Sequence, residues 1–143
     1  MRPAALVDTG FLLAVFERRD QWHRACLRTL EAVHYPLLTS EAVLAEMFHL
    51  VGGHPRDVEA AWKFVRSEAI ALASITAADL PALEYLMAHY HDRPMDFADA
   101  TLVRLAERES LSTILTIDHD DFETYRIGGR KRFTILPGRG DKD

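Results

Sequence analysis

Residues 112–118 read STILTID, and this stretch decides the fold. Its β-branched and apolar side chains predict a buried strand that ends at Asp118. Residues 3–8, PAALVD, form a second apolar run, and it ends at Asp8. Open α/β sheets build their sites at the carboxyl ends of such strands. The two aspartates are therefore the first candidates for a functional site.

Apolar periodicity and chain breaks place the other elements around these two strands. We expect further strands at 37–39, 69–75 and 133–136, the last at a sheet edge. We expect helices at 11–16, 21–34, 40–51, from 55 onward, 77–90 and 95–109, with Asp20, Ser40 and Thr76 as caps of three of them. Strands that alternate with helices predict an α/β fold with a mostly parallel sheet covered on both faces.

The length of 143 residues fits one domain, which we place at 1–137, followed by a basic and polar tail at 138–143. The single cysteine, Cys26, excludes an internal disulfide and is expected to be a small core residue. The N-terminus shows no signal pattern, and no apolar stretch reaches membrane-spanning length. We expect a soluble, cytoplasmic protein without a membrane partner.

The net charge of −5 argues against an ordinary nucleic-acid binder, which carries a basic excess. Bound divalent cations would offset part of this charge. The C-terminal region is locally basic and carries Arg126, Arg130, Lys131 and Arg132. These side chains either contact phosphates or belong to a solvated turn and tail.

Four acids far apart in the sequence carry the main functional signal: Asp8, Glu46, Asp99 and Asp118. The middle two lie on segments with helical periodicity. Carboxylates that converge at one edge of a sheet repel one another unless a cation joins them. Hard oxygen ligands suit Mg²⁺ or Mn²⁺. The pattern predicts a metal-dependent enzyme that acts on phosphodiesters.

Several of these acids also have a structural interpretation. Asp8 could cap the helix that follows it, although Thr9 could do so equally well. Glu46 lies on or beside the buried face of its helix, where an unpaired carboxylate is costly. Asp96 and Asp99 share one face of a helix start, and Asp96 is the better cap while Asp99 is the better ligand.

The fourth acid is ambiguous because Asp118 opens the run Asp118-His119-Asp120-Asp121. Asp118 is closest to the strand end, but Asp120 and Asp121 stay open as alternatives. We expect His119 to be a solvated loop residue. The other histidines show no zinc-ligand spacing, which argues against a zinc site.

The motifs together resemble PIN-domain proteins, in particular the VapC class of toxin ribonucleases. The matching pieces are Leu6-Val7-Asp8-Thr9, the helix start that carries Glu46, Asp96-Phe97-Ala98-Asp99-Ala100, and Leu115-Thr116-Ile117-Asp118 followed by Asp121-Phe122. Their order and spacing cover essentially the whole chain.

The resemblance implies a three-layer α/β/α fold with five parallel strands and the hydrolysis of single-stranded RNA with Mg²⁺ or Mn²⁺. By position, Asp8, Glu46, Asp99 and Asp118 are the four acids of the family's catalytic and metal site, and Thr9 matches a polar residue that is frequent beside the first acid. The extra acids Asp96, Asp120 and Asp121 depart from the family pattern, and we expect Asp96 and Asp121 to lie beside the metal ligands. One or two cations are compatible with this set. The resemblance also implies a homodimer and an antitoxin that blocks the pocket. Exposed helix faces around Trp22 or Trp62 are candidate dimer contacts.

Three other interpretations differ in their requirements. A receiver domain needs an acidic pair after the first strand and a lysine after a later one, and neither is present. A haloacid-dehalogenase phosphatase needs an aspartate where Gly10 stands. A PIN fold that binds RNA or protein without turnover has no distinguishing residue, so it stays open as the alternative function.

Overall fold

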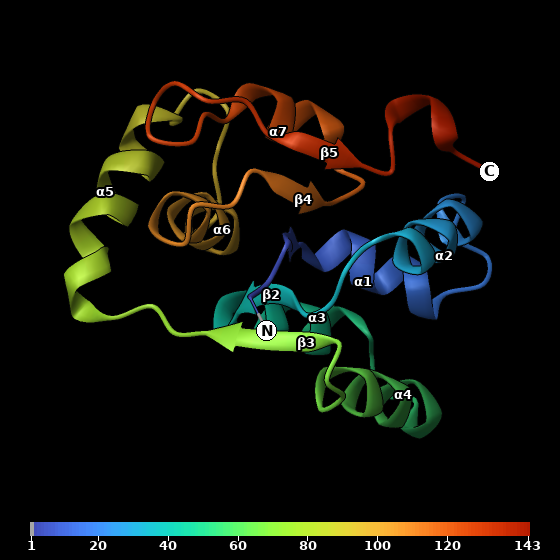
Figure 1. Ribbon diagram of the computed structural model, residues 1–143. Helices are drawn as coiled ribbons and strands as arrows, with labels where there is room; N and C mark the ends of the chain where they lie inside the picture. The colour runs from blue at the N-terminus through green and yellow to red at the C-terminus, as the bar shows by residue number, and fades with distance from the viewer. Residues whose placement is uncertain (1) are drawn as a thin grey trace.

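Five short parallel strands form one sheet in the computed structural model, which describes residues 2–143 (Figure 1). The strands lie in the order β3-β2-β1-β4-β5. Their bounds are β1 (Ala5–Val7), β2 (Leu37–Ser40), β3 (Ile70–Ala73), β4 (Thr113–Leu115) and β5 (Thr134–Leu136). The predicted parallel sheet with an edge strand near residue 134 is confirmed. The order also differs from the 2-1-3-4-5 order of receiver domains.

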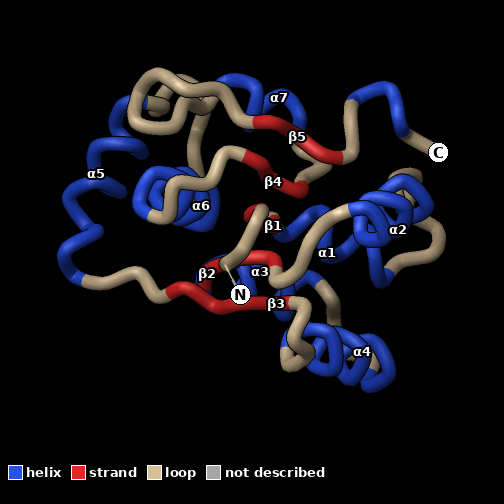
Figure 2. Tube along the Cα trace, in the orientation of Figure 1, coloured by secondary structure: helices blue, strands red, loops and turns tan. Residues whose placement is uncertain are grey.

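Helices cover both faces of the sheet, so the expected three-layer α/β/α fold is confirmed. The bounds are α1 (Thr9–Phe16), α2 (His23–Ala32), α3 (Glu41–Leu50), α4 (Pro55–Val65), α5 (Leu80–His89), α6 (Phe97–Arg108) and α7 (His119–Thr124). In Figure 1, α5 and α6 lie to the left of the strands, and α1 and α2 lie to the right. Figure 2 shows the strands stacked between these two sets of helices. Within residues 2–143, no helix combines the length and apolarity that crossing a bilayer requires.

The middle of the sheet is a topological switch point. The chain runs from β1 outward to β2 and β3, then crosses back to β4 on the other side of β1. Val7 at the end of β1 is paired with Leu115 at the end of β4. Ligands of open α/β sheets bind outside the carboxyl ends of strands at such a point. The residues that follow Val7 and Leu115 therefore lie where this fold places a site.

Two expectations near the N-terminus of α2 are wrong. Asp20 does not cap the helix, because the helix begins at His23 and the Asp20 carboxylate accepts from the Trp22 N–H instead. Trp22 is only 8% exposed and packs against the ring of His119, at 5.1 Å between centroids. It is therefore part of the core, and an exposed dimer contact at Trp22 is excluded.

His119 is also buried, which corrects our expectation of a solvated loop residue. The run after Asp118 is not a loop but the short helix α7. His119 is its first residue, and its Nε2 donates to the carbonyl of Pro137 at 2.8 Å. The ring thus joins α7 to the segment after β5 and packs on α2.

The last residues fold back onto α2, as the position of the C-terminus in Figure 1 shows. The Asp143 carboxylate accepts from the backbone N–H groups of Arg24 and Ala25, each at 2.8 Å. The first N–H groups of a helix have no partner within the helix. Asp143 therefore does the capping that Asp20 does not.

A buried aspartate joins the start of α5 to α6. Asp79 is 2% exposed and accepts from Arg104 Nε at 2.9 Å and from Arg108 Nη1 at 2.8 Å. It also accepts from the backbone N–H of Thr76, which was predicted to begin this segment. The Thr76 N–H and the Arg104 guanidinium hold the pKa of Asp79 at about 2.

Replacing Asp79 with alanine is expected to lower the free energy of unfolding by about 2 kcal/mol, because four hydrogen bonds to a charged group are lost. Urea denaturation at pH 7 measures the loss, and Glu84→Ala on the exposed face of α5 is the control. Because the pKa of Asp79 is lowered on folding, its contribution is complete above pH 4 and disappears as the pH falls through about 2. An equal loss in both variants would contradict the assignment.

Candidate active site

An open cavity of about 400 Å³ lies at the switch point, and all four predicted acids line it. They come from four elements: Asp8 follows β1, Glu46 lies on α3, Asp99 on α6, and Asp118 follows β4. The complete lining is Asp8, Thr9, Gly10, Leu13, Glu46, Leu50, Pro94, Asp96, Asp99, Ile117, Asp118 and Asp121. The structure thus brings together residues that are up to 110 positions apart in the sequence.

Asp8 is both a helix cap and a member of the acidic cluster, so the two interpretations do not compete. Its Oδ1 accepts from the backbone N–H of Thr9 at 2.8 Å. Its Oδ2 accepts from the hydroxyl of Thr116 at 2.9 Å. The side chain is 6% exposed, and these two bonds fix both of its oxygens.

Thr116 is a residue of the site that our sequence analysis missed. Its fully buried hydroxyl donates to Asp8 and accepts from the backbone N–H of Asp118 at 3.0 Å. One side chain therefore sets the position of two acids. The signal was available in principle, because β1 and β4 were both predicted, but the sequence does not show that they are neighbours in register.

Asp99 lies deeper than Asp96, as we predicted. Asp96 caps α6 by accepting from the Asp99 N–H at 2.7 Å. Asp99 itself is 8% exposed, and its Oδ2 accepts from the hydroxyl of Tyr125 at 3.0 Å. Tyr125 follows α7 and is the second residue of the site that our sequence analysis missed. No local pattern connects this tyrosine to an aspartate 26 positions earlier.

The structure of α7 reduces the number of candidates for the fourth acid. Asp120 points to the outside and pairs with Arg139 at 2.7 Å, and it does not line the cavity. Asp118 and Asp121 both line it. Asp118 caps α7, while Asp121 pairs with Arg93 at 3.1 Å. Asp118 is therefore the acid without a cationic partner among the residues that the structure describes.

Burial and mutual repulsion hold three of the acids at unusually high pKa values. Burial is the main cause at Asp99, whose pKa rises to about 8, and the charge of Asp8 adds to it. Burial raises the pKa of Asp8 to about 7, against the hydrogen bonds from Thr116 and Thr9. The pKa of Asp118 rises to about 6. Crowded carboxylates with raised pKa values are typical of functional sites.

The donor set fits a hard divalent cation, because it consists of carboxylate oxygens that face one cavity. In residues 2–143, no three His, Cys, Asp or Glu side chains are arranged closely enough to hold a metal ion without rearrangement. Of the four acids, Asp8 and Asp99 are buried, Glu46 is half-buried and Asp118 is exposed.

The four predicted RNA-binding residues do not line the acidic cavity. The Arg126 guanidinium donates to the carbonyls of Glu123, Thr124 and Tyr125 at the end of α7. Arg130 and Lys131 line a separate cavity beside Ser110 and Leu111, and Arg132 precedes β5. This is the edge where the parallel strands begin, opposite to the acids. Contact of these residues with RNA stays a prediction.

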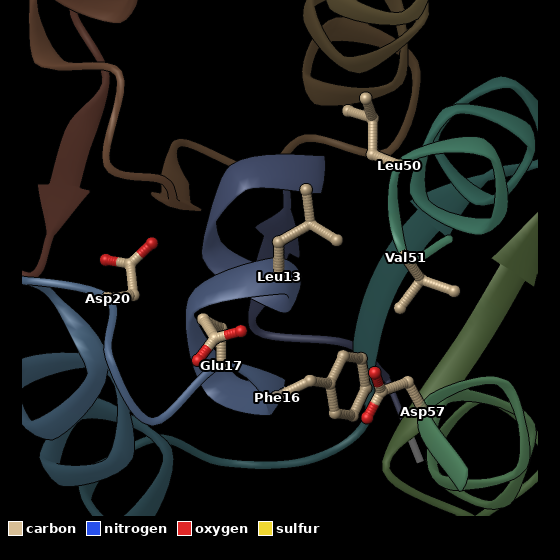
Figure 3. A pocket seen from close by; sticks show the side chains of 7 residues that line it. All are labelled: Leu13, Phe16, Glu17, Asp20, Leu50, Val51 and Asp57. Carbon is tan, nitrogen blue, oxygen red and sulfur yellow. The ribbon is translucent and has the colours of Figure 1, made fainter. Parts of the chain in front are cut away.

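A second cavity of about 240 Å³ adjoins the acidic one and shares Leu13 and Leu50 with it. We call it the side groove. Figure 3 shows Leu13 and Phe16 of α1 opposite Leu50 and Val51 at the end of α3. The remaining lining residues are acidic: Glu17, Asp20 and Asp57. The side groove therefore combines an apolar floor with a negative rim.

Comparison with known protein families identifies the family to which the chain belongs. The model of the PIN domain matches residues 5–127. The chain belongs to the PIN-domain family. The match covers all four acids of the cavity, and the resemblance seen in the sequence motifs is confirmed.

Individual PIN domains of the VapC type resemble the chain over most of its length. Ribonuclease VapC26 from Mycobacterium tuberculosis is 33% identical over 134 residues, which are 92% of this chain and 99% of that protein. The crystal structure of M. tuberculosis VapC20, a toxin that cleaves the sarcin-ricin loop, has a TM-score of 0.73 and 24% identity. That match covers 82% of this chain and 92% of VapC20.

A third PIN-domain comparison is with VapBC2 from Rickettsia felis, solved with a DNA fragment from the promoter of the pair. It has a TM-score of 0.66 and 14% identity and covers 92% of this chain and 98% of that one. The two structural matches establish the PIN fold alone. The 33% relative shows in addition that this chain is a VapC-like PIN domain.

Proposed function

We propose that the protein is a Mg²⁺- or Mn²⁺-dependent endoribonuclease that cleaves single-stranded RNA in the cytoplasm, as the toxin of a toxin–antitoxin pair. One observation carries this proposal: four acids from four elements line one cavity at the switch point of a PIN fold. The similarity to Ribonuclease VapC26 supports RNA as the substrate.

The two buried aspartates are the fixed part of the proposed metal site. Asp8 and Asp99 each have at least one oxygen held by a buried hydroxyl, which limits their rotation. Glu46 and Asp118 complete the ligand set or orient the attacking water. A bound divalent cation would lower the pKa of this water and offset negative charge on the phosphate. The raised pKa values of Asp8 and Asp99 support this proposal, because a nearby positive charge would favour their ionised forms.

Arg93 is the cation that the structure places beside this cavity. It precedes Pro94, which lines the cavity, and it pairs with Asp121 at the rim. Its side chain is 45% exposed, so it can exchange Asp121 for a phosphate without a burial cost. We therefore assign the first RNA-backbone contact to Arg93. The basic residues Arg130, Lys131 and Arg132 could only meet RNA that extends around the domain.

The lining of the side groove favours an antitoxin that binds through a basic, amphipathic segment. Its negative rim repels RNA, whereas its apolar floor and acids complement a basic, amphipathic protein segment. The side groove is continuous with the acidic cavity through Leu13 and Leu50. A segment bound there would reach the acids and block access of RNA to them.

Two exposed apolar surfaces are candidate contacts for the proposed homodimer. Trp62 on α4 is 50% exposed and packs on Phe48, and α5 exposes Leu80, Tyr85 and Met87. Apolar side chains that gather on a helix face are typical of protein–protein contacts. We place the dimer contact on one of these helices instead of at the buried Trp22.

Removal of divalent cations is the experiment that tests the proposed function. The purified protein, freed of any antitoxin, is incubated with a labelled pool of single-stranded RNA in Mg²⁺, in Mn²⁺ and in EDTA. We expect cleavage with either cation, no cleavage in EDTA, and full recovery when Mn²⁺ is added in excess over EDTA. Cleavage that persists in EDTA would contradict a metal mechanism.

The alternative function gives a different result in the same experiment. A PIN fold that binds without turnover would leave the RNA intact under all conditions. It would still bind RNA or a partner protein in a binding assay. That outcome would replace the proposed ribonuclease with a binding module.

A further inference from the structure

Tyr125 donates its hydroxyl hydrogen to Oδ2 of Asp99 at 3.0 Å, although it lies outside every motif that connects the chain to its family pattern. The side chain is fully buried. A buried hydroxyl needs a partner, but backbone carbonyls supply this partner in most cases. Here the partner is a carboxylate of the acidic cavity.

An aromatic cluster holds the ring of Tyr125 in place. Phe122 contacts it edge to face at 5.2 Å between centroids, and Tyr90 contacts it at 5.0 Å. The backbone N–H of Tyr125 donates to the carbonyl of Asp121 at the end of α7. The hydroxyl is therefore a fixed donor and not one that can swing away from Asp99.

The hydrogen bond from Tyr125 occupies Oδ2 of Asp99 and leaves Oδ1 available. Among the residues that the structure describes, no hydrogen bond to Oδ1 of Asp99 is found, and Asp99 lines the cavity. Asp8 has a similar arrangement, because the buried hydroxyl of Thr116 donates to its Oδ2. The two most buried acids of the cavity are thus each held by one buried hydroxyl.

We propose that Tyr125 is a positioning residue that holds Asp99 with one carboxylate oxygen presented to the divalent cation. The inference rests on the proposed metal-dependent function. Groups that hydrogen-bond to a metal ligand fix its orientation, and their loss reduces metal affinity or activity by about 10- to 100-fold. Tyr125 acts through Asp99 and does not touch the RNA.

Tyr125→Phe and Tyr90→Phe form a matched pair for the test. Each removes one hydroxyl from the same aromatic cluster and keeps the ring. The Tyr90 hydroxyl accepts from the backbone N–H of Arg126 and contacts no acid of the site. Mn²⁺ binding is measured by calorimetry without RNA, and cleavage is measured over a range of Mn²⁺ concentrations. Urea denaturation reports the stability of both variants.

We expect Tyr125→Phe to weaken Mn²⁺ binding by about 10-fold or more. Its cleavage should fall at low Mn²⁺ and recover in part at high Mn²⁺. Tyr90→Phe should bind Mn²⁺ and cleave RNA within about twofold of the wild type, because its hydroxyl contacts only backbone. This contrast separates positioning of Asp99 from a general effect on packing.

Two results would overturn the inference. Unchanged Mn²⁺ affinity in Tyr125→Phe, with or without a loss of stability, would show that the hydroxyl is only structural. If the wild type binds Mn²⁺ and cleaves RNA in that case, the proposed function stands and the inference alone fails. If the wild type neither binds Mn²⁺ nor cleaves RNA, the proposed function fails and the inference falls with it.

Discussion

Replacing Asp8 with asparagine is expected to lower RNA cleavage by about 10³-fold or more while the fold is kept. Asp8 is buried in the centre of the acidic cluster, and asparagine keeps its size. Its amide oxygen can still accept from the Thr9 N–H, and its amide N–H can donate to the Thr116 hydroxyl oxygen. What it loses is the negative charge that would hold the cation. Metal-ion catalysis supplies several kcal/mol of transition-state stabilisation, and each 1.4 kcal/mol corresponds to a factor of ten.

Asp120→Asn is the matched control for this prediction. Asp120 carries the same group, but it pairs with Arg139 outside the cavity. Cleavage by this variant should stay within about twofold of the wild type, as for most surface substitutions. The measurement is the initial rate of cleavage of a labelled RNA at saturating Mn²⁺, compared between Asp8→Asn and Asp120→Asn. Wild-type rates in Asp8→Asn would contradict the place of Asp8 in the metal site. Equal losses in both variants would contradict the distinction between the cavity and the outer face of α7.

Without divalent cations, the free energy of unfolding is expected to fall by about 3 kcal/mol between pH 5 and pH 8 from Asp8 alone. Its pKa is about 7 in the folded chain, against the ordinary aspartate value of 3.8 in the unfolded chain. An acid with a raised pKa binds its proton more tightly when folded, so folding is favoured at low pH. This contribution is lost as the pH rises through the folded pKa. Asp99 acts in the same direction.

Urea denaturation of EDTA-treated protein at pH 5, 6, 7 and 8 measures this slope. Asp8→Asn should show a shallower slope and should be more stable than the wild type at pH 8, because a buried charge has been removed. Added Mn²⁺ should stabilise the wild type at pH 8 more than it stabilises Asp8→Asn. Asp79 does not interfere, since its lowered pKa places its titration below pH 4. Identical slopes for wild type and variant would contradict the raised pKa of Asp8.

The strands and the four acids could be predicted because their signals are local. The run 112–118 is apolar and ends in an acid, and so does 3–8. Buried strands are continuous apolar segments in parallel sheets, so no knowledge of their neighbours is needed to see them. Asp96 as the cap and Asp99 as the deeper acid also follow from local helix geometry.

The parts that could not be predicted depend on contacts between distant residues. The start of α2 was placed too early because its N–H groups are satisfied by Asp143, more than 110 positions away. His119 was placed in solvent because nothing nearby reveals Pro137 and Trp22 as its partners. Thr116 and Tyr125 were missed for the same reason, since each becomes part of the site only through another element.

Because the chain crosses from β3 back to β4, the centre of the sheet can form only late during synthesis on the ribosome. β1 emerges before β4, its neighbour on one side, which follows more than 100 residues later. Pairing between segments so far apart is slow, because a long loop must close first. Asp118 and Tyr125 arrive later still. A nascent chain that has not yet reached Asp118 and Tyr125 thus carries Asp8 and Glu46 without the other residues of the cavity, so the proposed site can assemble only after β4 and α7 have been made.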